Sequence, residues 1–170
     1  SLSRVELEEH IPPDEKIPIV AQIRAVCTNL ANKASKRGMT IKMIVRRGLP
    51  KSTRILGNYD EVSEVFVNLI ENAIKYGNES SKIKVMISLA EPSSIRIDVI
   101  NRGEGIEKKH IPRLSERFYR VDKARSRQIG GTGLGLAIVK HIVNRHRGEM
   151  VISSQPGLSA TFSIILPINP

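Results

Sequence analysis

A glycine-rich run in the C-terminal third of the chain leads directly into an apolar segment. Residues 130–136 read Gly-Gly-Thr-Gly-Leu-Gly-Leu, and residues 137–143 read Ala-Ile-Val-Lys-His-Ile-Val. Glycines let the backbone approach a ligand where a β-carbon would clash. A turn that opens a helix also offers free N–H groups and the positive end of the helix dipole, which suit phosphate. The run therefore indicates a phosphate-binding turn, although tight packing of a turn against a helix produces the same pattern.

A second set of polar residues lies on the helix predicted for residues 58–76. Glu64, Asn68, Asn72 and Lys75 follow one another at steps of three or four, so they share one face. Asparagine is a poor helix former that prefers caps and turns. An amide oxygen is a hard ligand that suits Mg²⁺ with phosphate oxygens alongside, and lysine neutralises a phosphate as a point charge. The face is either a metal and phosphate site or simply a solvated surface.

The elements that must position these groups follow from hydrophobic periodicity. Apolar residues at helical spacing predict helices at 17–37, 58–76 and 133–147. The second helix begins with Asn58 as N-cap and Glu61 as its capping-box partner. Its core stripe comprises Val62, Phe66, Leu69 and Ala73, and Gly77 is its C-cap. Short apolar runs predict strands at residues 41–45, 54–56, 83–89, 95–100, 151–153 and 161–166.

Composition narrows the class of protein. The chain has 170 residues, 40% of them hydrophobic, which is enough for one domain with a core. No apolar stretch approaches the roughly 20 residues that span a bilayer, and no signal peptide is recognisable. The single cysteine, Cys27, lies on an apolar helix face and is read as a core residue in a reducing, cytoplasmic setting. The net charge of +10 suggests a polyanionic partner, and nucleotide phosphates fit better than nucleic acid because no recognition helix or aromatic interleaving is present.

Five segments together resemble the ATP-binding catalytic domain of bacterial sensor histidine kinases, in order and in spacing. They are the N box at 68–76, the first glycine box at 101–106, the F box at 115–120, the second glycine box at 131–136, and a degenerate last box at 157–162. Within the family, residues 117–126 are most similar to the kinases that sense phosphate limitation. The resemblance implies the Bergerat fold, an α+β, two-layer α/β sandwich whose mixed, mostly antiparallel sheet is covered on one face by three helices.

The resemblance also implies a site for ATP and Mg²⁺ between the helix 58–76 and a lid at about 104–132. In it Asn72 holds Mg²⁺, Asn68 contacts phosphate or the waters of the metal, and Lys75 contacts phosphate. Tyr76 packs near the adenine or ribose. The lid cations Arg120, Lys123, Arg125 and Arg127 include at least one that reaches the γ-phosphate, with Arg120 counted beside Asn68 and Lys75 as catalytic. The remaining nucleotide-binding residues implied are Asn101, Gly103, Gly105, Ile106, Gly131, Thr132, Gly133, Leu134, Gly135, Leu136 and Thr161.

Two positions set this chain apart from relatives in the wider superfamily. Gyrase- and chaperone-type ATPases carry a glutamate that activates water at the position of Asn68, and an asparagine cannot act as a general base. The site therefore favours phosphoryl transfer to a protein, in which positioning and charge neutralisation dominate. The first glycine box usually begins with aspartate, whereas this chain has Asn101, whose amide can both accept and donate. We therefore expect ATP binding to be retained, with an altered base preference.

The implied reaction needs partners outside this sequence. His10, His110, His141 and His146 do not lie in the context of an acceptor histidine, so the acceptor is expected on an upstream dimerisation domain. Residues 1–16 are expected to be a linker or the end of that domain, and residues 17–170 the catalytic domain. A homodimer formed through the missing domain, a response regulator and an inner-membrane anchor on the parent protein are implied. The alternatives are a degenerate nucleotide-binding regulatory module and a gyrase- or chaperone-type ATPase switch.

Overall fold

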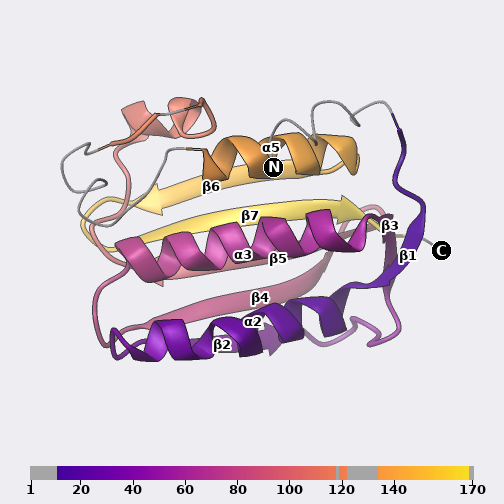
Figure 1. The fold of residues 1–170 in the computed structure, drawn as a ribbon, viewed down its shortest axis with the longest axis horizontal. Coiled ribbons are helices and arrows are strands. Elements are labelled where there is room, and N and C mark those ends of the chain that lie inside the picture. The colour runs from indigo at the N-terminus through magenta and orange to yellow at the C-terminus, as the bar shows by residue number, and fades with distance from the viewer. Residues whose placement is uncertain (1–10, 118, 122–133, 169–170) are drawn as a thin grey trace.

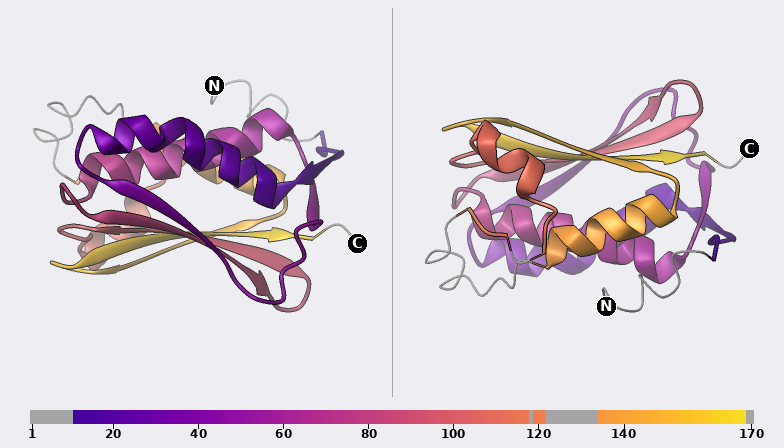
Figure 2. Two further views of the ribbon diagram at one scale, coloured as in Figure 1. Left: turned by 90° about the horizontal axis from the view of Figure 1, so that it is seen from below. Right: turned by 90° about the horizontal axis from the view of Figure 1, so that it is seen from above.

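The computed structural model describes residues 11–117, 119–121 and 134–168, which form two layers (Figures 1 and 2). One layer is a five-stranded sheet in the order β2-β4-β5-β7-β6, in which only β2 and β4 pair in parallel. The other layer holds the helices α2 (Ile19–Ser35), α3 (Tyr59–Tyr76) and α5 (Gly135–Arg145). The strands are β2 (Thr40–Val45), β4 (Lys82–Ala90), β5 (Ser94–Arg102), β6 (Glu149–Gln155) and β7 (Ser159–Pro167). The predicted fold class is confirmed.

Strict alternation along the central strands separates the two faces of the sheet. On β5, Ile95, Ile97 and Val99 are at most 1% exposed and face the helices. Because successive strand residues point to opposite faces, the intervening residues lie on the face without helices (Figure 2). The stripe on α3 predicted from the sequence is buried against this sheet, with Phe66 at 0% exposure. The core therefore lies between the sheet and the three helices.

A small second sheet lies at one end of the molecule and was not expected from the sequence. Strand β1 (Glu15–Pro18) pairs antiparallel with β3 (Arg54–Gly57), and Ile17 lies opposite Ile55. Both isoleucines are 1% exposed. Strand β1 has only four residues, of which two are charged and one is proline, so it shows no alternation of apolar and polar residues. For this reason residues 15 and 16 were assigned to the N-terminal linker. The first helix consequently begins at Ile19 rather than at residue 17.

The start of α3 is capped as predicted on one side only. The side chain of Asn58 accepts a hydrogen bond from the Glu61 backbone N–H, at 3.0 Å. The reciprocal hydrogen bond of a capping box, from the Asn58 backbone N–H to the Glu61 side chain, is not formed, so this part of the prediction is wrong. The Asn58 N–H donates instead to Nε2 of His146, at 3.0 Å. The Glu61 carboxylate instead pairs with Arg145 at 2.7 Å, and both side chains are at most 5% exposed. These contacts join the start of α3 to the end of α5.

The end of α3 lies directly against the end of β5. Gly77 and Gly103 form an isolated antiparallel bridge. A β-carbon on Gly77 would lie 2.5 Å from the Ala73 carbonyl oxygen, and one on Gly103 would lie 2.8 Å from that of Tyr76. Gly77 is the C-cap as predicted, but its backbone is extended with φ −73°, so the glycine is required by close approach rather than by a left-handed conformation. This contact brings the last turn of α3 beside the last residues of β5.

None of the helices in the described part of the chain combines the length and apolar character that crossing a bilayer requires. The short 3₁₀ helix η1 (Lys108–Arg113) follows β5. It lies near β6, at the end of the sheet where α3 ends (Figures 1 and 2).

Candidate functional site

A cavity of about 380 Å³ opens between α3, the start of α5, the inner face of the sheet and the segment that contains η1. Its lining divides into a polar wall on α3 and an apolar wall on the sheet and the segment after β5. A cavity of this size with a few polar groups is typical of a small-molecule site. The polar side chains from α3 are those singled out from the sequence, namely Asn68, Asn72 and Lys75.

Asn68 is held in one orientation by its own helix. Its Nδ2 donates to the Glu64 carbonyl oxygen at 2.8 Å. The oxygen Oδ1 therefore faces the start of α5, where a β-carbon on Gly135 would lie 3.1 Å from it. Asn68 thus presents an acceptor, and not a proton-abstracting carboxylate, where α3 meets the first turn of α5.

Asn72 and Lys75 are half-buried in the cavity wall. Among the described residues, neither side chain has a hydrogen-bond or ion-pair partner. Both side chains thus line the cavity with their bonding capacity unused within the described part of the chain. An amide oxygen beside an ammonium group can hold a hard cation and an anionic oxygen next to each other.

The first turn of α5 forms the edge of the same cavity. Leu134, Gly135 and Leu136 line it. Leu134 is the N-cap and supplies no side-chain cap, so backbone N–H groups of the first turn have no intrahelical partner. These N–H groups lie at the positive end of the helix dipole. The described part of the glycine-rich run thus lies at the cavity edge, and its phosphate-binding role stays a prediction, while Gly131, Thr132 and Gly133 lie outside the described residues.

Asn101 lies at the apolar end of the cavity, on β5. It is 6% exposed, and its amide makes no hydrogen bond with another described residue. Around it the lining is apolar and aromatic, from Tyr76, Leu136, Ile138, Ala160 and Phe162. A buried amide without a partner is costly unless a ligand or water satisfies it. This end of the cavity suits a flat group with hydrogen-bonding edges.

The segment after β5 is fixed to the β6–β7 turn by backbone contacts. Gly105 has φ +69°, and a β-carbon there would lie 2.7 Å from the Gln155 carbonyl oxygen, so glycine is required. The Ile106 backbone N–H donates to Oγ of Ser154 at 2.7 Å, and the Gly157 N–H donates to the Glu104 carbonyl oxygen at 2.6 Å. These bonds hold Gly105 and Ile106 in the cavity wall.

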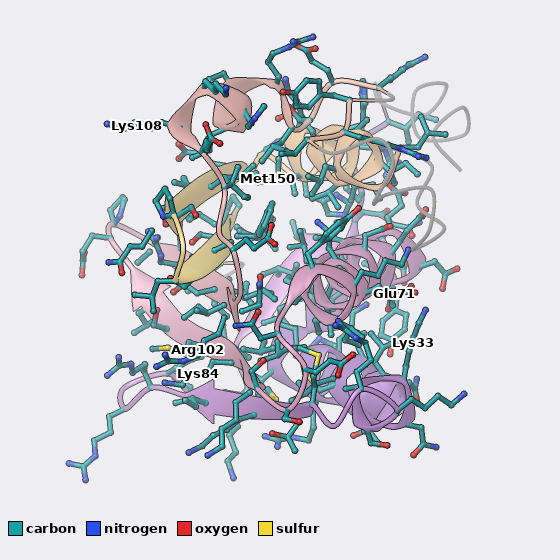
Figure 3. All side chains as sticks on the ribbon, turned by 90° about the vertical axis from the view of Figure 1, so that its left-hand side faces the viewer. Lys33, Glu71, Lys84, Arg102, Lys108 and Met150 are labelled. Atoms are coloured by element: carbon teal, nitrogen blue, oxygen red, sulfur yellow. The ribbon has the colours of Figure 1, made fainter. Side chains whose placement is uncertain are left out.

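The charged groups of the described lining leave a small positive excess. Glu71 and Glu104 contribute negative charge, and Lys75 and Arg120 contribute positive charge. Glu71 forms an ion pair with Lys33 of α2, which lies outside the lining, and Figure 3 labels both residues. Because Lys33 neutralises Glu71, two basic groups and one acidic group remain in the described wall, which suits an anionic ligand.

Two predicted site residues do not line the cavity. Thr161 pairs with Ile100 of β5, and its neighbours Ala160 and Phe162 line the cavity instead. Alternation along β7 places Thr161 on the opposite face of the sheet. Gly103 is also absent from the lining and serves the close approach of β5 to α3 described above.

Other lining residues were not predicted. They are Glu71, Glu104, Leu114, Tyr119, Val121, Ile138, Ala160 and Phe162. Ala160 and Phe162 could have been found from strand alternation. Tyr119 could not, because it lies in an irregular segment without periodicity and is positioned by side chains of that segment: its hydroxyl bonds Nδ1 of His110, and the Arg113 guanidinium lies 4.4 Å from its ring centre.

Arg120 lies in the cavity wall, and its contact with a γ-phosphate stays a prediction. Lys123, Arg125 and Arg127 lie outside the described residues. Among the described residues, no group of three or more His, Cys, Asp or Glu side chains could hold a metal ion.

Comparison with known proteins identifies close relatives. Residues 57–170 match the model of the histidine kinase-, DNA gyrase B- and HSP90-like ATPases. The chain is 36% identical over 162 residues to the phosphate regulon sensor protein PhoR of Pseudomonas aeruginosa, covering 95% of this chain and 35% of that protein. It is 34% identical over 169 residues to the sensor-like histidine kinase SenX3 of Mycolicibacterium smegmatis, covering 99% of this chain and 43% of that protein. The chain thus spans less than half the length of these relatives.

The fold is also that of a solved kinase structure. The mycobacterial sensor histidine kinase MprB superposes with a TM-score of 0.78 at 22% identity, covering 92% of this chain and 99% of that one. At this identity the likeness establishes the fold.

Proposed function

The chain belongs to the family of histidine kinase-, DNA gyrase B- and HSP90-like ATPases, and from that premise we propose that it binds Mg-ATP and donates the γ-phosphoryl group to a histidine. The family and its sensor-kinase relatives support ATP as the ligand. The observation that carries the proposal is the cavity wall on α3, where Asn72 and Lys75 line the cavity without partners among the described residues, beside the first turn of α5.

The residues present fit a magnesium ion. Asn72 offers an amide oxygen that no described residue occupies, and amide and phosphate oxygens with waters make an octahedral set that Mg²⁺ accepts. When bound, the ion would neutralise charge on the phosphates and orient them. Oδ1 of Asn68, directed toward Gly135, would accept from a water of the metal rather than donate to phosphate.

The other groups would orient the nucleotide. The N–H groups of Gly135 and Leu136 would donate to phosphate oxygens, and Lys75 and Arg120 would neutralise charge on the β- and γ-phosphates. The purine would lie at the apolar end with Tyr76 beside it and its hydrogen-bonding edge on Asn101. Because an amide accepts from the adenine amino group and donates to the neighbouring ring nitrogen, Asn101 can replace a carboxylate there.

The absence of a general base at Asn68 favours transfer to a protein over hydrolysis. In the transfer, the bond between the γ-phosphorus and the β–γ bridging oxygen breaks and a bond to a histidine nitrogen forms, with ADP leaving. An asparagine cannot take a proton from water. We therefore expect a low steady-state ATPase rate, and a high rate would favour a gyrase- or chaperone-type switch instead.

Isothermal titration with ATP and GTP in the presence of Mg²⁺ tests the binding proposal. We expect ATP to bind, and absence of detectable binding would refute the assignment. For transfer, the chain is mixed with the histidine-containing domain of its parent and labelled ATP. We expect that domain to be labelled and the chain alone to remain unlabelled.

Asn72→Ala is the matched loss variant in this assay. We expect it to abolish labelling because the metal loses its protein ligand. Unchanged labelling would show that the metal assignment is wrong. Retained ATP binding without labelling by the unaltered chain would favour a regulatory module that has lost transfer activity.

The parent protein is proposed to act as a homodimer through its histidine-containing domain and to pass the phosphoryl group to a response regulator. This rests on the names of the sensor-kinase relatives. Cytoplasmic placement of this domain and anchoring of the parent in the inner membrane are proposed on the same basis.

A further inference from the structure

A second cavity, of about 530 Å³, lies on the face of the sheet that carries no helix among the described residues. We call this cavity the cationic groove. Its lining contains the cations Lys42, Lys82, Lys84 and Arg102. Two serines and two apolar residues complete the lining, and none of the lining residues is acidic. Figure 3 labels Lys84 and Arg102, which come from the neighbouring strands β4 and β5.

The strand register packs these charges closely. Lys42 of β2 lies directly opposite Lys84 of β4, and Lys84 lies opposite Ile100 of β5. Neighbouring strands are about 4.8 Å apart, so the two lysines are cross-strand neighbours. Like charges in directly opposite positions destabilise a sheet. The arrangement therefore lowers the stability of the free protein unless an anion lies between the cations.

No carboxylate of the described residues neutralises this cluster. None of its four cations has a hydrogen-bond or ion-pair partner for its side chain among them. On the same sheet face, Asp98 accepts from Arg96 at 3.0 Å and also bonds the Ser163 hydroxyl. That carboxylate is therefore already engaged, and the groove keeps an unbalanced positive charge.

We propose that this groove binds a small soluble ligand that carries two or more phosphate groups. Lysine ammonium groups bind phosphate as point charges, and arginine adds a two-pronged contact. The cavity volume lies in the range for small ligands. Ile100 and the half-exposed Leu158 supply an apolar surface that free phosphate alone would leave uncovered.

The groove is separate from the nucleotide cavity. Ile100 and Arg102 line the groove, whereas Asn101 between them lines the nucleotide cavity on the other face of β5. The same division holds on β7, where Ser159 belongs to the groove and Ala160 to the nucleotide cavity. A ligand in the groove therefore need not compete with a nucleotide.

The test is a titration of the ¹⁵N-labelled chain with tripolyphosphate, without Mg²⁺, followed by amide chemical shifts. We expect saturable shifts at residues 42, 82–84 and 100–102. The double variant Lys42→Gln, Lys84→Gln should weaken this binding by about tenfold or more, because it removes two of the four cations that face the ligand. It should also raise the thermal midpoint of the free chain at low salt, because the cross-strand repulsion is relieved.

The control removes the same charge elsewhere. Lys36 and Lys140 are exposed and lie outside the groove, so Lys36→Gln, Lys140→Gln should leave the binding and the shifts unchanged. Equal weakening in both double variants would mean that only net charge matters, and would overturn the proposal. Shifts confined to 68–76 and 134–136 would also overturn it, by placing the phosphate in the nucleotide cavity. Binding only to an acidic protein surface, with none to tripolyphosphate, would contradict the ligand class.

Discussion

Replacement of Asn101 by leucine should separate nucleotide binding from stability. The side chain is 6% exposed and its amide has no partner among the described residues. Leucine is similar in size, so the substitution breaks no hydrogen bond within the described protein and replaces an unpaired polar group by an apolar one. The free energy of unfolding should therefore change by less than about 1 kcal/mol, in the direction of higher stability.

Nucleotide affinity should respond in the opposite sense. If the amide makes two hydrogen bonds to a purine, each with a net value of about 0.5–1.5 kcal/mol, the loss is about 1–3 kcal/mol. That corresponds to an affinity about 5- to 140-fold lower, since about 1.4 kcal/mol is tenfold. Because rotation of the amide exchanges donor and acceptor, the leucine variant should lose affinity for ATP and for any measurable GTP binding alike.

The assay is calorimetric titration with Mg-ATP and Mg-GTP, paired with urea unfolding of the same samples. Asn144→Leu on the exposed side of α5 is the matched control, and its affinity should equal that of the unaltered chain. Unchanged ATP affinity in the Asn101 variant would refute the role given to this amide. A loss of stability above about 2 kcal/mol would show that the amide has a structural partner.

Four further results are expected. ATP affinity should fall when EDTA removes Mg²⁺, and Asn72→Ala should make calorimetric titrations with and without the metal agree, because the variant lacks the amide oxygen proposed to hold the ion. Burial holds the pKa of His146 below its ordinary value of 6.5. The unfolded state therefore binds more protons than the folded state below that pH, so the free energy of unfolding should fall as the pH drops below about 6.5. In His146→Gln this part of the pH dependence should disappear, and urea unfolding at several pH values measures it. Arg145→Met should lower the free energy of unfolding by about 3–5 kcal/mol, as urea unfolding measures, because it leaves the Glu61 carboxylate buried and unpaired. One oxygen of that carboxylate already lacks a partner among the described residues. Glu61→Gln in the same background should recover part of the loss. Burial raises the pKa of the Cys27 thiol to about 11, so iodoacetamide at pH 8 should label it only upon unfolding, and rapid labelling of the native chain would contradict its burial.

Features that depend on one element could be predicted from the sequence. The polar residues on α3 share a face because helical spacing dictates it, and Asn68, Asn72 and Lys75 all line the cavity. The N-cap role of Asn58 could likewise be predicted from the sequence of α3 alone. The hydrogen bond from its N–H to His146 could not be predicted, because it joins positions 88 residues apart and depends on how α5 packs.

Much of the apolar wall lies on an irregular segment. Its path is fixed in part by a contact with a distant strand, where the Ile106 N–H is bonded to Ser154, and in part within the segment itself, where His110 and Arg113 orient Tyr119. No periodic pattern marks such positions, since an irregular segment takes its path from the surfaces it contacts. Short-range sequence signals therefore identified the polar wall of the cavity more completely than its apolar end.

Thr161 was expected at the nucleotide site but does not line the cavity. Here the alternation of side chains along the strand would have predicted its position. Phe162 and Ile164 are at most 6% exposed and share one face of β7, so an odd-numbered neighbour must lie on the other face. A shift of one residue would move every one of these side chains out of the core, which fixes the register. The same constraint acts on β5, where the alternation that buries Val99 also turns Asn101 toward the nucleotide cavity and Arg102 toward the cationic groove. Core formation in this sheet thus determines which chemistry each face presents, and a one-residue insertion in β5 should exchange the two faces and abolish both sites together.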